Sequence, residues 1–332
     1  MKKFNVAVVG VGAVGVEMLR ILKERKFPVG KLKVFARSER DIYVDKDSYH
    51  VLKVDHHGFK NIDIALFAGT EGEKGAAVTY ASSAIKQGAV VIDNGADFRM
   101  EKDVPLVVPE VNPKDIKKHK GIISNPNCST IQMVVALAPI QKRLGLKRII
   151  VCSYQAASGA GRSAVKELMA QSKAVLDGKT VKPDALPQQI AFNVFPHIGG
   201  FQKESYTSEE WKTVKETHKI FHDDKIKVTA TCVRVPVATG HSEAVYIETK
   251  KAMSVSKLQN LLSKSAGIEV VDDPKNGKYP LPINAEGKDA VYVGRIRKDP
   301  FVKNAYWLWV VSDNLRKGAA LNAIQIAELL IK

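Results

Sequence analysis

Cysteine and long apolar runs are scarce in this sequence of 332 residues. The three cysteines, Cys128, Cys152 and Cys232, are odd in number and widely spaced, which argues against a disulfide framework or a structural zinc site and for a reducing compartment. No apolar run approaches the roughly 18 to 20 residues that a membrane-spanning helix needs. The N-terminus lacks the architecture of a signal peptide. We therefore expect a cytoplasmic protein without metal.

Internal repeats, low-complexity segments and basic blocks are also lacking. Lysine and arginine outnumber the acids 51 to 35, for a formal net charge of +16, but they are scattered among those acids. No basic run with interleaved aromatics, zinc finger or RNP-type motif marks a nucleic-acid surface. We read the charge as a general positive field that attracts small anions, and we expect no nucleic-acid partner. The length allows two domains.

The chain is organised around residues 121–131, where an apolar strand meets Pro126 and a helix begins. Proline restricts the residue before it to an extended conformation. Ser129 or Thr130 offers N-cap chemistry for a helix over residues 131–143. Apolar residues recur there at helical spacing, so one face is expected to be buried and the N-terminus held in place.

Cys128 lies at the start of that helix. Unpaired backbone N–H groups at a helix N-terminus favour an anion, so we predict a lowered pKa for this thiol and a role as nucleophile. The alternative is that a lone cysteine serves as a small buried apolar side chain. Its neighbours in Asn125-Pro126-Asn127 favour the nucleophile.

Residues 4–9 form a β-branched apolar run that leads into a glycine-rich loop and an amphipathic helix through Lys23. Strand, G-x-G-x-x-G and helix form the context of a dinucleotide fingerprint, in which glycines let the backbone approach the pyrophosphate. A glycine-rich turn of another α/β protein is the alternative. The loop predicts cofactor contacts from Gly10, Gly12, Ala13, Val14 and Gly15.

Arg37 and Ser38 follow the second strand, about twenty residues past the glycines. An NAD site would place Asp or Glu there for the ribose hydroxyls, whereas Arg with Ser suits a 2′-phosphate. The pair favours NADP, with a solvated surface arginine as the alternative.

Strands alternate with helices along the first half of the chain, which indicates a mainly parallel, doubly wound sheet. Arg99 follows one of these strands, at the end where open α/β sheets bind ligands. It could hold a phosphate or form a surface ion pair. The expected elements are strands at 33–36, 64–68, 90–93 and 106–108 and a helix at 76–87.

The second half begins with a strand at 148–154, which ends at Gln155 and a small-residue loop that could run close to a ligand. A helix is expected at 208–221, with a capping box formed by the residues at its start. Glu216 and Lys219 share one face of this helix, as a surface pair or as a charged site.

Two β-rich runs, 227–237 and 243–249, flank a turn and predict a hairpin. Arg234 lies within apolar strand and must face water, a partner or an anionic ligand. His241 follows the turn and is a candidate general base, although most histidines are structural or exposed. A closing helix at 319–330 has an apolar face suited to packing on the first domain.

Together these residues resemble the aspartate-semialdehyde dehydrogenase family over nearly the whole chain, most closely its form common in Gram-positive bacteria. The matching segments are Val-Pro-Glu-Val-Asn at 108–112, Asn-Pro-Asn-Cys-Ser-Thr-Ile-Gln-Met at 125–133, Tyr-Gln-Ala-Ala-Ser-Gly-Ala-Gly at 154–161, Thr-Cys-Val-Arg-Val-Pro-Val at 231–237, His-Ser-Glu-Ala-Val-Tyr-Ile-Glu at 241–248, Val-Gly-Arg-Ile-Arg-Lys-Asp at 293–299 and Val-Val-Ser-Asp-Asn-Leu at 310–315.

The resemblance implies NADPH-dependent, reversible reductive dephosphorylation of L-aspartyl 4-phosphate to L-aspartate 4-semialdehyde through a cysteine thioester, on the route to lysine, methionine and threonine. It implies a Rossmann-type NADP-binding domain at 1–128, completed by a C-terminal helix at 314–332, and an α+β catalytic and dimerisation domain with a large mixed sheet at 129–313. A homodimer is implied as well. The implied roles are Cys128 as nucleophile, His241 as acid/base catalyst, Gln155 as substrate-orienting group, Arg99, Lys219 and Asn127 at the phosphate, Arg234 at the substrate carboxylate, Glu216 at its amino group, and Ser158, Gly159 and Asn314 at the cofactor.

Three segments depart from the family pattern. The loop at 10–15 is one residue shorter and lacks a threonine, and residues 69–75 replace a serine-rich cofactor loop. Residues 96–99, Ala-Asp-Phe-Arg, resemble text of the N-acetylglutamyl phosphate reductases, which remain an alternative. A non-catalytic nucleotide-binding or nucleic-acid-binding homologue would be expected to lose Cys128 or His241, and both are present.

Overall fold

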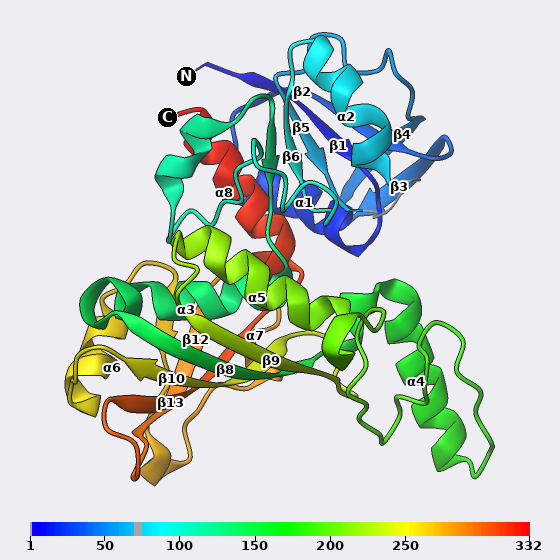
Figure 1. Cartoon of the computed structure of the whole chain (residues 1–332). Coiled ribbons are helices and arrows are strands. Elements are labelled where there is room, and N and C mark those ends of the chain that lie inside the picture. The colour runs from blue at the N-terminus through cyan, green and yellow to red at the C-terminus, as the bar shows by residue number, and fades with distance from the viewer. Residues whose placement is uncertain (1, 70–74) are drawn as a thin grey trace. The chain divides into compact units, whose positions relative to one another are not determined.

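The computed structural model describes residues 2–69 and 75–332 and divides into two compact units (Figure 1). The first unit comprises Met1–Asn127 and Ala319–Lys332, and the second Cys128–Gly318. The atypical loop at 69–75 falls largely outside the described residues.

The first unit contains a seven-stranded sheet in the order β3-β4-β2-β1-β5-β6-β7. Its neighbouring strands are parallel except for β3 and β4, which form an antiparallel hairpin. The elements are β1 Phe4–Val9, α1 Ala13–Glu24, β2 Val29–Ala36, β3 Arg40–Val44, β4 Asp47–Lys53, β5 Ile64–Phe67, α2 Ala76–Lys86, β6 Val90–Asp93, η1 Pro113–Lys118, β7 Ile122–Ser124 and α8 Leu321–Leu330. The predicted doubly wound sheet is confirmed, while β3 and β4 were missed by the sequence reading.

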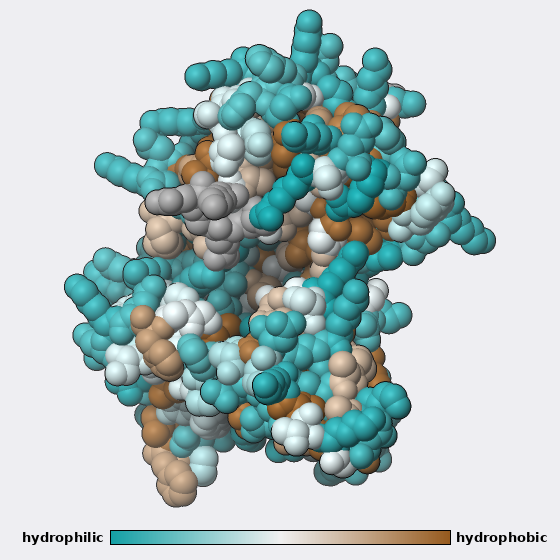
Figure 2. Space-filling model, turned by 90° about the vertical axis from the view of Figure 1, so that its right-hand side faces the viewer, coloured by the Kyte–Doolittle hydropathy of each residue, from teal (hydrophilic) through white to brown (hydrophobic). Residues whose placement is uncertain are grey.

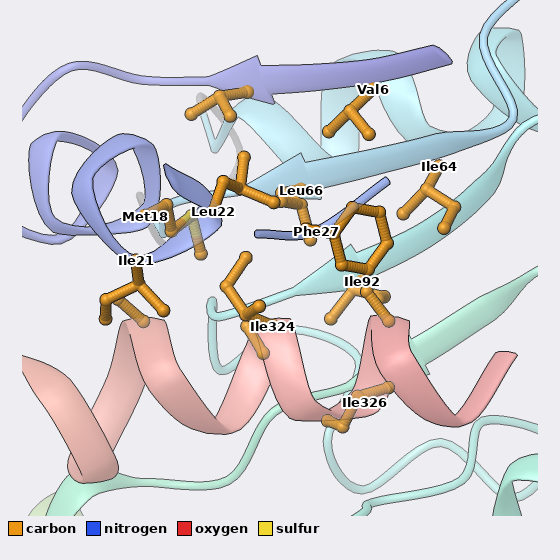
Figure 3. Packing of buried hydrophobic residues seen from close by; sticks show 14 of the residues in the cluster. Val6, Met18, Ile21, Leu22, Phe27, Ile64, Leu66, Ile92, Ile324 and Ile326 are labelled. Atoms are coloured by element: carbon orange, nitrogen blue, oxygen red, sulfur yellow. The ribbon is translucent and has the colours of Figure 1, made fainter. Parts of the chain in front are cut away.

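Both faces of the central strands β1, β5 and β6 are buried, which is why these strands are mostly apolar, whereas the edge strands β3 and β4 are more polar and more exposed. Successive residues of a strand point to opposite faces, so Val6 and Val8 join one cluster and Ala7 and Val9 the other. Figure 3 shows the first cluster, where Ile324 of α8 lies beside side chains of α1 and the sheet. The prediction that the closing helix packs on the first domain is therefore confirmed.

The second unit contains a six-stranded mixed sheet in the order β11-β12-β13-β10-β8-β9. Helices α3, α5 and α6 pack on it (Figure 1). The elements are α3 Cys128–Leu144, β8 Leu146–Gln155, α4 Arg162–Leu176, α5 Ser208–Phe221, β9 Lys227–Arg234, β10 His241–Thr249, α6 Val255–Ser263, β11 Ile268–Val270, α7 Pro282–Ala285, β12 Val291–Lys298 and β13 Ala305–Ser312. The predicted large mixed sheet is confirmed.

The predicted hairpin of the two β-rich runs is wrong, because β8 lies between β9 and β10. β9 pairs in parallel with β8, from Arg148–Lys227 to Gln155–Arg234. β10 pairs with the other edge of β8 and runs antiparallel to it. The chain after β9 therefore crosses the end of β8, a placement that a turn between two apolar runs does not reveal.

Three local expectations also need correction. Helix α3 starts at Cys128, so Ser129 and Thr130 lie inside its first turn and neither is its N-cap residue. The strand expected at 106–108 is a single bridge from Leu106 to Ser124. Cys152 and Cys232 both lie within apolar runs of the sequence, which predicts buried side chains; Cys232 is buried, whereas Cys152 is half-buried.

Hydrophilic residues cover most of the face seen in Figure 2, and hydrophobic residues occupy small separate areas between them. Among the described residues, no helix combines the length and the apolar character needed to cross a membrane.

Candidate active site

Cys128 is the first residue of α3, and its Sγ lies 3.3 Å from Nε2 of His241. The thiol thus meets both the positive end of a helix of 17 residues and an imidazole at the start of β10. The structure joins two residues 113 positions apart that the sequence had singled out separately. A sulfur in this setting is suited to act as a nucleophile.

The backbone around His241 sets the tautomer of its ring. The N–H of Ala156 donates to Nδ1 at 3.0 Å, so Nδ1 carries no proton and the ring proton of the neutral form is on Nε2, toward the sulfur. Burial, and then the charge of Arg234, lowers the pKa of His241 to about 3. His241 is therefore a neutral hydrogen-bond donor to Cys128 at physiological pH.

Arg234 ends β9 with only 4% of its surface exposed. Its Nη1 donates to the carbonyl oxygen of Ala156 at 2.7 Å. Burial lowers the pKa of Arg234, and the charge of Glu209 opposes that change. Within the part of the chain that the structure describes, this guanidinium makes no other hydrogen bond, so N–H groups are left for an anionic ligand.

Gln155 is held at both ends of its amide. Oε1 accepts from Ser153 Oγ at 3.0 Å, and Nε2 donates to Glu209 Oε1 at 3.1 Å. Glu209 lies in the first turn of α5, whose predicted capping box of Thr207 and Glu210 is confirmed. Sequence reasoning missed Glu209, although its helical spacing to Glu216, seven residues on, was a usable signal.

Glu216 lies two turns further along α5, and Lys219 lies in the last turn of this helix. Glu216 is 1% exposed, so the interpretation of this pair as a solvated surface pair is wrong for the glutamate. A carboxylate removed from water needs a cation or several hydrogen bonds to remain charged. The buried face of α5 therefore carries carboxylates at its start and at its centre.

The small-residue loop after β8 packs against these side chains. Asn314 Oδ1 accepts from Ser158 Oγ at 3.1 Å and from the N–H of Gly240 at 2.9 Å, which ties the loop to the turn before β10. A Cβ on Gly159 would lie 3.0 Å from Arg234 Nη1 and 3.1 Å from His241 Cε1. A side chain at position 159 would therefore press on Arg234 and His241.

The first unit provides the features of a dinucleotide site. Gly10 has φ +101°, and a Cβ on Gly15 would lie 1.9 Å from the carbonyl oxygen of Gly10, so no side chain fits at this crossing. Gly12 precedes α1, and a Cβ there would meet nothing within 4 Å, which leaves room for a ligand beside the helix start, at Ala13 and Val14. The shortened loop therefore keeps the form that a pyrophosphate needs.

Arg37 and Ser38 are exposed at the end of β2. Arg40, which the sequence reading missed, donates from Nη1 to Ser38 Oγ at 3.0 Å, so a second guanidinium lies at this serine. Glu39 Oε1 is 3.2 Å from His50 Nε2 and Asp41 Oδ1 is 2.8 Å from His50 Nδ1, so one imidazole contacts both carboxylates of this segment. These residues fit a cofactor with a 2′-phosphate.

Arg99 and Asn127 also belong to the first unit. Arg99 follows β6 and donates from Nη2 to the carbonyl oxygen of Asn94 at 2.8 Å. Asn127 is the last residue before α3 and is 7% exposed. Both are buried polar groups at the carboxyl ends of parallel strands, as expected of ligand-binding residues in such sheets.

Known families and proteins match this chain along its length. The family described as "Semialdehyde dehydrogenase, NAD binding domain" matches residues 5–119, and "Semialdehyde dehydrogenase, dimerisation domain" matches residues 137–317. The aspartate-semialdehyde dehydrogenase of Aquifex aeolicus is 52% identical, covering 99% of this chain and 98% of the relative. The chain belongs to the aspartate-semialdehyde dehydrogenase family.

Other members support this assignment. The Bacillus subtilis aspartate-semialdehyde dehydrogenase is 48% identical over 99% of this chain and 97% of its own length. The crystal structure of aspartate semialdehyde dehydrogenase II from Vibrio cholerae, complexed with ASA, has a TM-score of 0.95 at 45% identity and covers 100% of this chain and 99% of that one. The predicted fold, NADP cofactor and aspartate-semialdehyde dehydrogenase activity are thereby confirmed.

Gly318 is a further residue of this aspartate-semialdehyde dehydrogenase site that sequence reasoning missed. A Cβ added to it would lie 2.8 Å from Cys128 Cβ and 3.3 Å from Cys128 Cα. Both atoms are fixed to the backbone, so the start of α3 would have to move. We expect Gly318→Ala to lower kcat by roughly 10- to 100-fold, because small displacements of reacting groups are costly.

The matched control for that prediction is Gly200→Ala, where an added Cβ meets nothing within 4 Å. Steady-state kinetics of both variants, with melting temperatures alongside, provide the measurement. A wild-type kcat in Gly318→Ala would show that turnover does not depend on the free space beside Cys128.

Proposed function

We propose that Cys128 and His241 carry out the reductive dephosphorylation of L-aspartyl 4-phosphate in this enzyme. The observation that carries the proposal is the 3.3 Å approach of Sγ to Nε2 at the N-terminus of α3. An acyl phosphate has a good leaving group and needs a soft, potent nucleophile, which a thiolate at a helix terminus supplies. The predicted lowering of the Cys128 pKa stays a prediction.

In the first step, the Cys128 thiolate attacks the acyl carbon, and a carbon–sulfur bond forms. The resulting oxyanion collapses to a thioester as the bond from carbon to the phosphate oxygen breaks, and the departing phosphate takes up a proton. Arg99, Lys219 and Asn127 are proposed to hold that phosphate, since cationic and amide N–H groups bind its oxygens.

NADPH, when bound, supplies the hydride that reduces the thioester. His241 then donates a hydrogen bond from Nε2 to the sulfur as the carbon–sulfur bond breaks, the aldehyde leaves and Cys128 returns as thiolate. No proton needs to move at the imidazole, because the leaving phosphate takes up the single proton of the net reaction. We infer that His241 stabilises charge as a neutral donor, which refines the acid/base role implied by the resemblance.

The remaining side chains suit the charges of the substrate. Arg234 is proposed to pair with the substrate carboxylate through its free N–H groups, and Glu216 with the substrate ammonium. Gln155 orients the acyl group, and Glu209 keeps its amide in one rotamer. A substrate without a free amino group, such as N-acetylglutamyl phosphate, has no ammonium to pair with Glu216 and is disfavoured.

We propose that Arg37 and Ser38 bind the 2′-phosphate of NADP and that residues 10–15 bind its pyrophosphate, with Ser158, Gly159 and Asn314 near the nicotinamide. Arg37→Ala is expected to weaken NADP binding about 10- to 100-fold, which corresponds to the 1.5–3 kcal/mol of one hydrogen bond to a charged group. Binding of NAD should change little. Titration calorimetry with each nucleotide measures this difference without turnover.

Lys46→Ala is the control for Arg37→Ala, because it removes one positive charge from the exposed turn between β3 and β4. Equal losses of NADP and NAD affinity in Arg37→Ala would place the 2′-phosphate elsewhere.

The activity assay is phosphate-dependent reduction of NADP with aspartate semialdehyde, run beside NAD and beside N-acetylglutamate semialdehyde. We expect turnover with aspartate semialdehyde and NADP and little with the other aldehyde. Faster turnover of N-acetylglutamate semialdehyde would favour the alternative reductase.

We also propose that the protein is a cytoplasmic homodimer of the form common in Gram-positive bacteria that binds no nucleic acid. The match to a family described as a dimerisation domain supports the dimer, and the similarity to the Bacillus subtilis protein supports the form. A catalytic thiol that must stay reduced supports the location. Light scattering measures the mass of the dimer. A gel shift with nucleic acid, with an affinity that falls steeply as the salt concentration rises, would contradict the absence of nucleic-acid binding.

A further inference from the structure

Glu243, Ser153 and Cys232 form a row of side chains across three neighbouring strands of the second sheet, next to the strand ends that carry His241, Gln155 and Arg234. Residues two apart on a strand share a face, so Glu243 points to the same side of β10 as His241. Glu243 pairs with Ser153 of β8, and Ser153 in turn pairs with Cys232 of β9. Glu243 and Cys232 have no part in the proposed mechanism, and Ser153 enters it only through its hydrogen bond to Gln155.

Glu243 is buried without a compensating charge. Only 1% of its surface is exposed, and its Oε2 makes no hydrogen bond to any residue that the structure describes. Burial raises the pKa of this carboxyl well above its ordinary range. Burial therefore favours the neutral carboxylic acid, which can both donate and accept a hydrogen bond.

Gln132 connects this carboxyl to the nucleophile. It follows Cys128 by one helical turn, so both side chains project from the same face of α3. Its Oε1 accepts from Ser312 Oγ at 2.8 Å, which directs Nε2 away from β13. Nε2 of Gln132 is fully buried and has no hydrogen-bond partner among the described residues. It lies close enough to the Glu243 carboxyl to oppose the rise in the pKa of that carboxyl, although the two groups are outside hydrogen-bond geometry in this structure.

We propose that Glu243 is a positioning residue, whose carboxyl engages the Gln132 amide and thereby fixes the first turn of α3, with Cys128, over His241. The proposal rests on the proposed roles of Cys128 and His241. A hydrogen bond between these two buried groups satisfies Glu243 Oε2 and Gln132 Nε2 once they close to bonding distance, whereas an apolar group in place of either removes the polar neighbour of the other and drives the helix to shift. A shift of the first turn moves Sγ away from Nε2.

The neutral form of Glu243 predicts which substitutions are tolerated. Glutamine matches the shape and hydrogen-bonding capacity of a protonated glutamate, so Glu243→Gln should retain wild-type behaviour. Leucine at 243 and methionine at 132 keep most of the volume and lose the hydrogen bonds. Glu243→Leu and Gln132→Met should therefore behave alike.

The experiment is alkylation of the full-length enzyme with iodoacetamide between pH 5 and 10, followed by mass spectrometry of the peptide that contains Cys128. We expect Glu243→Leu and Gln132→Met to raise the pKa of Cys128 by about one unit, because the thiolate loses its His241 donor, and to slow alkylation at pH 7 roughly tenfold. kcat should fall in both with little change in KM. Glu243→Gln should match wild type in each readout.

Tyr306→Phe is the control for a purely structural loss. Tyr306 is fully buried at the other end of β13 and bonds through its hydroxyl to the backbone of Met253, so its removal should lower the melting temperature and leave the Cys128 titration unchanged. Should Glu243→Leu fail to fold, Gln132→Met gives the same test from α3.

Unchanged titration of Cys128 in both apolar variants would overturn the proposal, as would a Glu243→Gln variant as impaired as Glu243→Leu. Failure of the proposed function is distinguishable, since it would appear in the wild-type enzyme as a Cys128 that titrates as an ordinary thiol.

Discussion

Cys128→Ala is expected to lower kcat by on the order of 10⁶, to the background rate, since removal of a nucleophile costs about that much in enzymes with covalent intermediates. Without Sγ, no thioester can form, and the hydrogen bond at 3.3 Å from His241 loses its partner. The fold should persist, because the substitution adds no volume beside Gly318. Stopped-flow kinetics in the phosphate-forming direction provide the measurement.

Two companion variants sharpen this test. Cys152→Ala removes a half-buried thiol from β8 and should keep wild-type activity. Cys128→Ser keeps a weak nucleophile and should show severely reduced turnover. An acyl adduct trapped from the wild-type enzyme should map to residue 128, and an adduct on Cys152 or Cys232 would refute the assignment.

His241→Gln is expected to lower kcat by roughly 10²- to 10⁴-fold, the range for loss of a positioned acid/base or donor group. Glutamine can place an amide near the sulfur but cannot also accept from the Ala156 N–H as the ring does. His197→Gln, at a half-buried histidine that stacks on Phe201, is the control and should be near wild type.

The pH dependence of both activity and stability follows from the lowered pKa of His241. With a folded-state pKa of about 3, the ring stays neutral from pH 5 to 9, so no kinetic limb in that window should belong to it. Between pH 6.5 and 3 the unfolded state binds the extra proton, so stability falls as the pH drops. His241→Gln removes this contribution. A limb near pH 6.5 that disappears in His241→Gln would contradict the neutral donor.

Glu209 and Glu243 show how far the polar environment of the site extends beyond residues that touch substrate. Glu209 holds the Gln155 amide at 3.1 Å, and Glu243 lies beneath the Cys128–His241 pair. Glu243 lies in the matching segment 241–248 and Glu209 lies at helical spacing from Glu216, but the sequence analysis assigned a role to neither. Both became visible only when β8, β9 and β10 were placed side by side under α3 and α5.

The sequence by itself determined the local elements and the chemistry of the candidate residues. The glycine loop, the helix at Cys128, the capping box of α5 and the alternation of strand and helix depend on propensities and spacings within about twenty residues. These signals sufficed for the two-domain fold and, with the motifs, for the family.

Tertiary structure alone decided which distant residues meet. The sequence predicted β9 and β10 as a hairpin, but β8 lies between them in the sheet. This order is set by pairing between strands that are far apart in the sequence, which local patterns do not encode. That order brings Ala156 to His241 and Arg234, and so fixes the ring's tautomer and lowers its pKa. Burial and neighbouring charge exist only in the packed molecule, which is why the residues of the site could be named from the sequence and their protonation states could not.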